Sequence, residues 1–177
     1  MKSHWLISIK LTFVTLIVFG VIYPLLISGI AWLTAVNHGE GNLDLIGQSF
    51  TSDKYFNGRP SAINYNAAAT GGSNKGPSNP DYLKQVEERI NKFLQHNPTI
   101  KREDVPVDLV TASGSGLDAH ISVKAANVQV ARIASTRGIP AELVRKIIGK
   151  NTERPFLGLF GPERINVLKL NKALDEL

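Results

Sequence analysis

The sequence contains no cysteine among its 177 residues. Disulfide bonds, thiolate metal ligands and cysteine nucleophiles are therefore excluded. Histidine is also scarce, and its four copies lie far apart in the sequence, so they predict no metal site. Any folded domain in this chain must therefore depend on side-chain packing, without covalent cross-links.

Charge of one sign is not concentrated in any part of the chain. Lys and Arg together number 20 and Asp and Glu 15, which gives a formal net charge of +5. This excess is mild and is spread along the sequence rather than clustered. Such a distribution argues against a nucleic-acid groove and against an acidic ligand. We therefore expect no nucleic-acid partner.

The chain does contain one long apolar run, LTFVTLIVFGVIYPLLISGIAW, from Leu11 to Trp32. A bilayer core about 30 Å thick needs roughly 20 apolar residues in a helix, so we expect a transmembrane helix over residues 11–35. Trp32 suits the headgroup layer, and Gly20 offers a small surface to another helix. Pro24 removes one helical hydrogen bond and predicts a kink.

The charges that flank this run predict its orientation. Lys2 and Lys10 precede the run, whereas the first basic residue after it is Lys54. The positive-inside rule then places residues 1–10 in the cytoplasm and the rest of the chain outside, as a single-pass protein of the inner or plasma membrane. A cleavable signal peptide is the alternative, but its apolar part spans only about 7 to 15 residues.

The residues after the span are expected to form a tether and one domain. Residues 36–45 are polar and contain glycine, as tethers do. Residues 46–177 suffice for one domain with a core but not for two. Helical and strand patterns occur there without regular alternation, which predicts a small mixed helix and strand domain of the α+β class outside the cytoplasm.

Capping residues and apolar periodicity predict three helices in this domain. Asn79 and Ser122 are good N-caps, and Gly138 is a good helix stop. Pro140 suits the first turn of a third helix. The predicted helices run from Pro80 to Asn97, from Ser122 to about Arg137 and from Pro140 to Gly149.

Short strands are predicted from branched and aromatic residues between turn formers. Residues 46–66 contain Asn57-Gly58, a dipeptide typical of tight two-residue turns. The segment VPVDLVTA, which begins at Val105, is expected to be extended. The strongest strand candidate is INVLKL, Ile165 to Leu170, with Asn171 as the cap of a last helical turn.

The segment SGSGLDAH, Ser113 to His120, is the candidate for chemistry, because it combines two serines with a carboxylate and an imidazole. It raises the alternative of a membrane-anchored exported serine hydrolase that uses Ser113 or Ser115. A nucleophile elbow has the pattern G-x-S-x-G, which Gly114-Ser115-Gly116 lacks. A triad also draws its members from separate segments. A tight turn before the Ser122 helix, with Asp118 in local backbone hydrogen bonds, is the favoured interpretation.

Several sequence segments of this chain occur in the same order as in the C subunit of the Kdp potassium-importing ATPase. The N-terminal apolar span also matches the layout of that family. The chain resembles this family over nearly its whole length. Ala119 and Val123 stand where the family's LDPHISP has prolines. The segments are GQSF, YFNGRPSA, NYNA, GGSN, GPSNP, VPVDLVTASGSGLDAHIS, TERPFLG and INVLKLNKALD.

The resemblance implies a non-catalytic accessory subunit of a high-affinity, ATP-driven potassium import complex. The implied partners are a potassium-binding A subunit, an ATP-hydrolysing P-type B subunit and a small F subunit, together with membrane lipid. The family's C subunit is needed for assembly and stability, and is described as a catalytic chaperone that raises the ATP affinity of the B subunit. The resemblance implies no cofactor for the C subunit itself, because the B subunit is the one that uses ATP.

In the family the segment that matches Ser113, Gly114, Ser115 and Gly116 is suggested to take part in nucleotide binding. ATP is cytoplasmic, whereas the charge rule places this segment outside. Direct contact with ATP would therefore require the opposite orientation of the span. We expect instead that the domain lies over the potassium entrance of the A subunit and affects ATP use indirectly.

Overall fold

The computed structural model describes residues 2–35, 43–155 and 157–177. They form two compact units, with the division at Leu43 and Asp44. Residues 36–42 of the expected tether lie outside the described residues.

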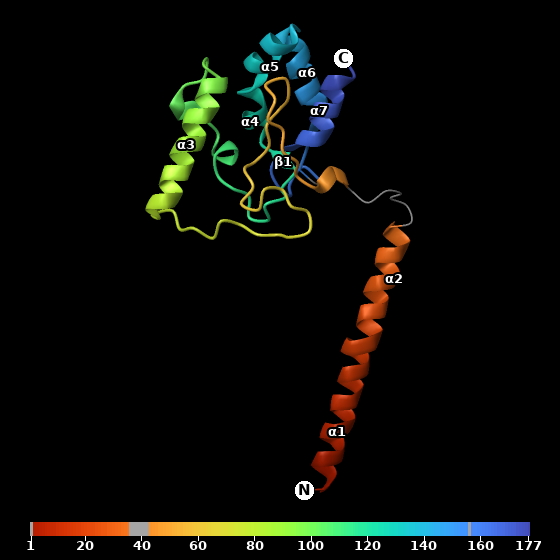
Figure 1. The fold of residues 1–177 in the computed structure, drawn as a ribbon. Coiled ribbons are helices and arrows are strands. Elements are labelled where there is room, and N and C mark those ends of the chain that lie inside the picture. The colour runs from red at the N-terminus through yellow and green to blue at the C-terminus, as the bar shows by residue number, and fades with distance from the viewer. Residues whose placement is uncertain (1, 36–42, 156) are drawn as a thin grey trace. The chain divides into compact units, whose positions relative to one another are not determined.

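The first unit is a continuous helix made of α1 (Lys2–Ile17), a π-helical turn η1 (Val18–Ile22) and α2 (Tyr23–Ala35) (Figure 1). Residues His4–Leu33 have a high mean hydropathy and are exposed throughout, and 30 residues are long enough to cross a membrane. The N–H of Tyr23 donates to the carbonyl of Val18, the spacing of a π turn. This turn lies directly before Pro24, which has no N–H to donate.

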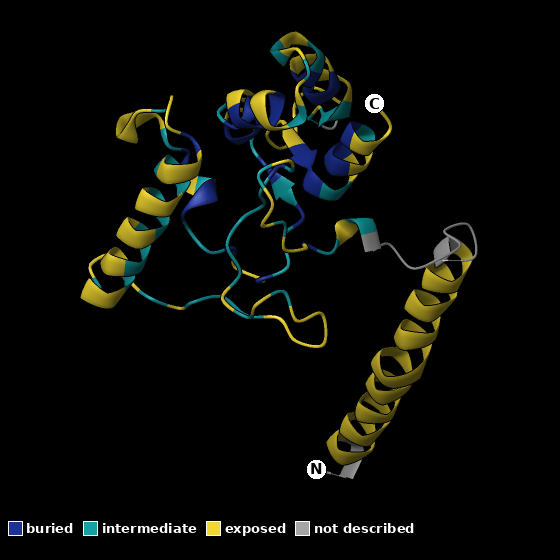
Figure 2. Ribbon diagram, turned by 45° about the horizontal axis from the view of Figure 1, so that its top comes forward, coloured by how far each residue is buried: buried dark blue, intermediate teal, exposed yellow. Residues whose placement is uncertain are grey.

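The second unit is an α+β domain, as predicted, with most of its core between four helices. Buried residues concentrate in these helices and in the short strands beside them (Figure 2). The core includes Phe56, Ile133, Ile148, Ile165 and Leu170. The four helices are α4 (Val123–Asn127), α5 (Val130–Arg137), α6 (Ala141–Asn151) and α7 (Val167–Asp175).

A three-stranded antiparallel sheet joins these helices. The strand order is β1-β3-β2, so the last strand in the sequence lies in the middle. His120 pairs with Asn166, and Thr152 pairs with Ile165. The strands are β1 (His120–Ile121), β2 (Thr152–Glu153) and β3 (Arg164–Asn166).

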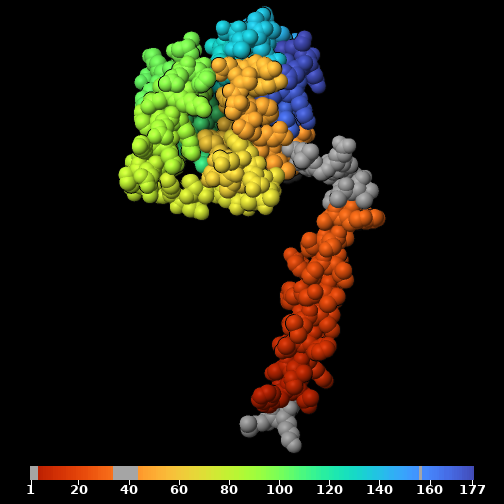
Figure 3. Space-filling view, viewed as in Figure 1, coloured from red at the N-terminus to blue at the C-terminus, as the bar shows by residue number. Residues whose placement is uncertain are grey.

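Helix α3 (Pro80–His96) lies apart from the other helices of the domain (Figure 1). It begins as predicted, because the Asn79 Oδ1 accepts a hydrogen bond of 3.0 Å from the N–H of Tyr82. No residue of α3 is buried, although its apolar face, which includes Ile90 and Phe93, is half-buried. In Figure 3 the segment around residues 45–58 lies between α3 and α7.

The Ser122 cap and the Gly138 stop are confirmed. Ser122 Oγ accepts from the N–H of Ala125, and Gly138 adopts the left-handed conformation with φ of 65°. The predicted single helix between them is two helices, α4 and α5, which are separated at Val128 and Gln129.

The predicted end of the next helix at Gly149 is wrong. Helix α6 continues to Asn151, because Gly149 keeps a helical backbone there. The last turn is closed by side chains. Asn151 Nδ2 donates to the carbonyl of Ile147, and Thr152 Oγ1 donates to the carbonyl of Ile148.

The predicted strand from Ile165 to Leu170 is wrong beyond Asn166. Helix α7 begins at Val167, and its cap is Asn166, whose Oδ1 accepts from the N–H of Lys169 at 3.0 Å. Val167, Leu170 and Leu174 are buried, with the spacing of one helix face. Asn171 is therefore not a cap but a buried residue within α7.

The predicted strands in residues 46–66 and the extended segment from Val105 are also corrected. Residues 46–66 form an irregular chain whose β pairing, among the described residues, is a single bridge between Ile46 and Asp118. The turn precedes Asn57-Gly58, since the N–H of Tyr55 donates to the carbonyl of Ser52. Three 3₁₀ helices also occur, at Leu43–Leu45, Arg102–Asp104 and Val107–Leu109.

Two buried side-chain amides replace a partner strand for Phe56 and Asn57. Asn171 Oδ1 accepts from the N–H of Phe56 at 2.8 Å, and Asn171 Nδ2 donates to the carbonyl of Phe56 at 3.0 Å. Gln129 makes the corresponding pair with Asn57, at 2.8 and 3.3 Å. Each amide thus satisfies both main-chain groups of one residue, as a ladder would.

We expect the Asn171→Leu substitution to destabilise the domain. It leaves the buried N–H and carbonyl of Phe56 without partners, at a cost of about 2–5 kcal/mol. The matched control is Asn127→Leu, on the exposed face of α4, which should change stability by less than about 0.5 kcal/mol. Urea unfolding of the full chain in detergent, followed by circular dichroism, measures both. Equal effects of the two substitutions would contradict this account of the amide pairs.

Candidate functional site

The segment Ser113–Gly116 forms a turn that is packed against residues 60–72. The N–H of Ser113 donates to the carbonyl of Pro60 at 3.0 Å, and the N–H of Gly71 donates to the carbonyl of Ser115 at 2.9 Å. Ser113 is 2% exposed, whereas Ser115 lies on the surface. The two candidate serines therefore have opposite accessibility.

Glycine is required at one position of this turn. Gly116 has a φ of +73°, and a Cβ there would lie 2.5 Å from Ile63 Cγ1 and 2.8 Å from the carbonyl oxygen of Gly71. Gly114, by contrast, has open space where a Cβ would lie. The close approach of two backbone segments therefore explains why position 116 requires glycine.

Several groups of the turn donate within the domain rather than outward. The N–H groups of Ser113 and Gly116 donate to main-chain carbonyls, and that of Leu117 donates to Ser115 Oγ at 3.1 Å. A phosphate cradle needs adjacent N–H groups directed at the ligand. Nucleotide contact by Ser113, Gly114, Ser115 and Gly116 remains a prediction from the family resemblance.

Asp118 is the centre of a charged cluster beside this turn. Its Oδ2 lies 3.1 Å from Arg59 Nη1, and its Oδ1 accepts from the N–H of His120 at 3.0 Å, the predicted local bond. His120 Nδ1 lies 3.5 Å from the same carboxylate. Hydrogen bonding from His120, assisted by Arg59, lowers the pKa of Asp118 to about 2 despite partial burial.

The geometry does not assemble a serine hydrolase triad. His120 Nε2 is buried, has no hydrogen-bond partner among the described residues and lies 3.8 Å from Glu153 Oε2. Ser115 Oγ accepts a main-chain hydrogen bond and Ser113 is buried. A triad requires the serine hydroxyl to be hydrogen-bonded to the imidazole. The alternative of catalysis by Ser113 or Ser115 is therefore rejected.

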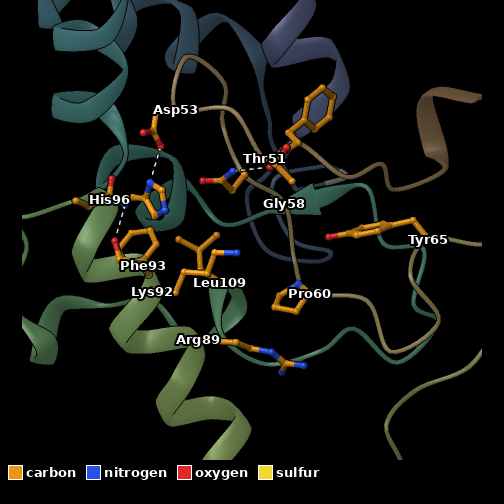
Figure 4. A pocket seen from close by; sticks show the side chains of 13 residues that line it. Thr51, Asp53, Gly58, Pro60, Tyr65, Arg89, Lys92, Phe93, His96 and Leu109 are labelled. Atoms are coloured by element: carbon orange, nitrogen blue, oxygen red, sulfur yellow. Dashed lines mark hydrogen bonds and ion pairs between the residues drawn. The ribbon is translucent and has the colours of Figure 1, made fainter.

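A cavity that the sequence did not predict lies between α3 and residues 50–60 (Figure 4). Its volume is about 210 Å³, below the roughly 300–1,000 Å³ of sites for drug-sized ligands. Phe50, Tyr65 and Phe93 line it, with Arg89 and Lys92. Tyr65 Oη donates to the carbonyl of Arg59 at 2.7 Å, and burial raises the pKa of Tyr65. These residues come from separate segments, so no sequence motif indicates them.

The chain matches the family described as "KdpC: K+-transporting ATPase, c chain" over residues 5–176. It is 46% identical to the Potassium-transporting ATPase KdpC subunit of Caldanaerobacter subterraneus, over 96% of the chain and 93% of the relative. A Bacteroides fragilis protein of the same name is 47% identical, over 96% and 95%. One from Bacillus cereus is 47% identical, over 96% and 93%.

We expect the Asp118 cluster to make stability depend on acid pH. The pKa of Asp118 is lower in the folded than in the unfolded chain, so the carboxylate stabilises the domain above about pH 4 and this contribution is lost towards pH 2. After allowance for solvent screening, it amounts to about 1–2 kcal/mol. Urea unfolding at several pH values measures the free energy of unfolding of the wild type and of Asp118→Asn. The difference between these two free energies should decrease as the pH falls from about 4 to 2. A difference that stays constant with pH would contradict the assignment.

Proposed function

The chain belongs to the KdpC family, the c chain of the K+-transporting ATPase, and we propose on this premise that it assembles with the A, B and F subunits of that complex. It is an accessory subunit of a transport ATPase and not an enzyme itself. The observation that carries the proposal is the match over residues 5–176, which includes both the apolar helix and the domain. The relatives share this layout, since each is covered over more than nine-tenths of its length.

The proposed role is to hold the complex together and to support ATP use by the B subunit. The apolar helix His4–Leu33 supplies a surface for membrane-embedded partners, and Gly20 has open space around it where another helix can approach. The domain supplies a second, water-exposed surface. A subunit with one membrane helix and one folded domain can thus contact its partners both within and outside the bilayer.

We place the domain on the outer side of the membrane, over the potassium entrance of the A subunit. Support comes from Lys2 and Lys10, which precede the uncharged run Leu11–Trp32, and from the absence of Lys or Arg between Leu11 and Asp53. In this orientation the segment Ser113–Gly116 lies on the other side of the membrane from cytoplasmic ATP. The subunit then raises ATP affinity through contacts that differ between states of the pump, not by touching the nucleotide.

The test of the assembly role is copurification. An affinity-tagged chain, expressed with the other subunits and extracted from membranes in mild detergent, is expected to retain the A and B subunits. The Val18→Arg variant should lose this association, because a charge in the middle of the span costs about 2.5–3.5 kcal/mol on insertion. Gel electrophoresis and mass spectrometry identify the retained proteins.

The matched control for copurification is Val107→Arg, the same substitution at a residue of the domain that is 69% exposed. It should leave insertion of the chain into the membrane unchanged, and with it the association with the A and B subunits. A wild-type chain that is recovered from such membranes without the large hydrophobic subunits would refute the assembly role.

The orientation is tested by introducing one cysteine at a time. Because the natural sequence has no cysteine, any labelling comes from the introduced residue. Because Ser115 is exposed, Ser115→Cys should react with a membrane-impermeant maleimide in intact cells. Ser113→Cys is the control, since a side chain that is 2% exposed should stay unlabelled in the folded protein. Labelling of Ser115→Cys only after lysis would reverse the orientation and make direct ATP contact possible.

A further inference from the structure

The loop between β2 and β3 exposes three large apolar side chains within four residues. Leu157 is 74% exposed, Leu159 80% and Phe160 64%. Other large apolar residues that are exposed in the described part of the domain, such as Leu83, stand singly. Scattered apolar residues are normal on a protein surface, but a concentrated group indicates contact with an apolar partner.

The conformation of this loop presents these side chains outward. The N–H of Gly158 donates to the carbonyl of Pro155 at 2.9 Å, which closes a turn. Leu157, Gly158 and Gly161 have positive φ values of 54°, 72° and 88°. A β-carbon at Gly158 or Gly161 would meet nothing within 4 Å. Every residue from 157 to 164 is exposed.

The loop is connected to the place where the chain enters the domain. Asn166, at the end of β3, donates through Nδ2 to the carbonyl of Asp44, and Lys172 Nζ lies 3.1 Å from Asp44 Oδ1. Phe160 is six residues before Asn166, about 20 Å at full extension. The residues from Ala35 to Leu43 can span at most about 30 Å. Chain length therefore keeps this loop within reach of the bilayer that the apolar helix crosses.

The size of the group favours lipid over a protein partner. A stable protein interface uses about 800 Å² and 20–30 residues on each side, far more than three side chains at a loop tip. Shallow insertion into the headgroup region needs only a few Leu or Phe side chains, and nearby basic residues strengthen it. Arg154 and Arg164 are exposed on either side of the apolar residues. However, Arg164 Nε lies 2.9 Å from Glu153 Oε2, and Glu163 is exposed beside it. The flanking charges therefore balance, and it is the apolar side chains and the nearby anchor that favour lipid.

We propose that Leu157, Leu159 and Phe160 insert into the headgroup and upper acyl region of the membrane to which the chain is anchored. The loop is thus a second membrane contact, which limits the rotation of the domain about its tether. The proposal rests on the membrane anchoring in the proposed function, but not on its orientation or on the other subunits.

The test uses Leu159→Cys in the full chain, labelled with the environment-sensitive dye NBD and reconstituted alone into phosphatidylethanolamine and phosphatidylglycerol vesicles. The NBD emission should shift to shorter wavelength and lose at least half its intensity when the vesicles contain lipids with a doxyl quencher in the upper acyl chain. The control is Leu177→Cys, which is 59% exposed beyond the end of α7 that lies away from β3. Its dye should show neither change.

Further variants make the outcomes decisive. Replacing Leu157 and Phe160 with Ser in the Leu159→Cys chain should abolish most of the quenching, whereas flotation of the chain with the vesicles should persist because the helix anchors it. Absence of quenching in a chain that floats would overturn the loop proposal and leave the proposed function intact. Protection of the dye only after the other subunits are added would also overturn it, in favour of a protein contact.

Discussion

The domain depends on buried polar side chains that hold an irregular segment against its helices. Gln129 and Asn171 satisfy the main chain of Phe56 and Asn57, and Arg132 extends this network. Its guanidinium, whose pKa is lowered by burial, donates to the side chains of Gln129, Asn57 and Asn97 and to the carbonyl of Asp53. Since buried polar groups are costly when unpaired, removal of one member affects the others.

The same network helps to determine where α3 and the cavity lie. Asn97, directly after α3, is 2% exposed and bonded to Arg132 Nε at 3.2 Å, and His96 Nδ1 lies 2.8 Å from Asp53 Oδ1. Helix α3 has no buried residue, but Phe93 packs against the core and Arg89 Nη1 donates to the carbonyl of Val110 at 3.0 Å. The contacts of Asn97 and His96 add to this packing and fix the C-terminal end of the helix. The cavity beside Phe50 and Phe93 follows from this arrangement.

Local signals predicted the elements that local chemistry determines. The caps at Asn79 and Ser122 and the stop at Gly138 each act within a few residues, and all three were found from the sequence. The strands predicted in residues 46–66 failed for a different reason. Their partners are side-chain amides more than 70 residues away in the sequence, at Gln129 and Asn171, which no local pattern reveals. The family resemblance was identified from long sequence segments, so it did not require knowledge of these tertiary contacts.

In the candidate site, too, some features are determined by nearby residues and others by contacts with distant parts of the chain. The turn at Ser113–Gly116 was predicted from its glycines, but the buried state of Ser113 follows from its contact with Pro60, far earlier in the chain. In our proposal the domain lies outside the cytoplasm, so an effect on cytoplasmic ATP is transmitted by the apolar helix, which reaches the other side of the membrane. Its π turn at Val18–Ile22 weakens regular hydrogen bonding beside Pro24. Contacts of this part of the helix with membrane partners, rather than Ser115, are therefore where coupling between pump states is to be sought.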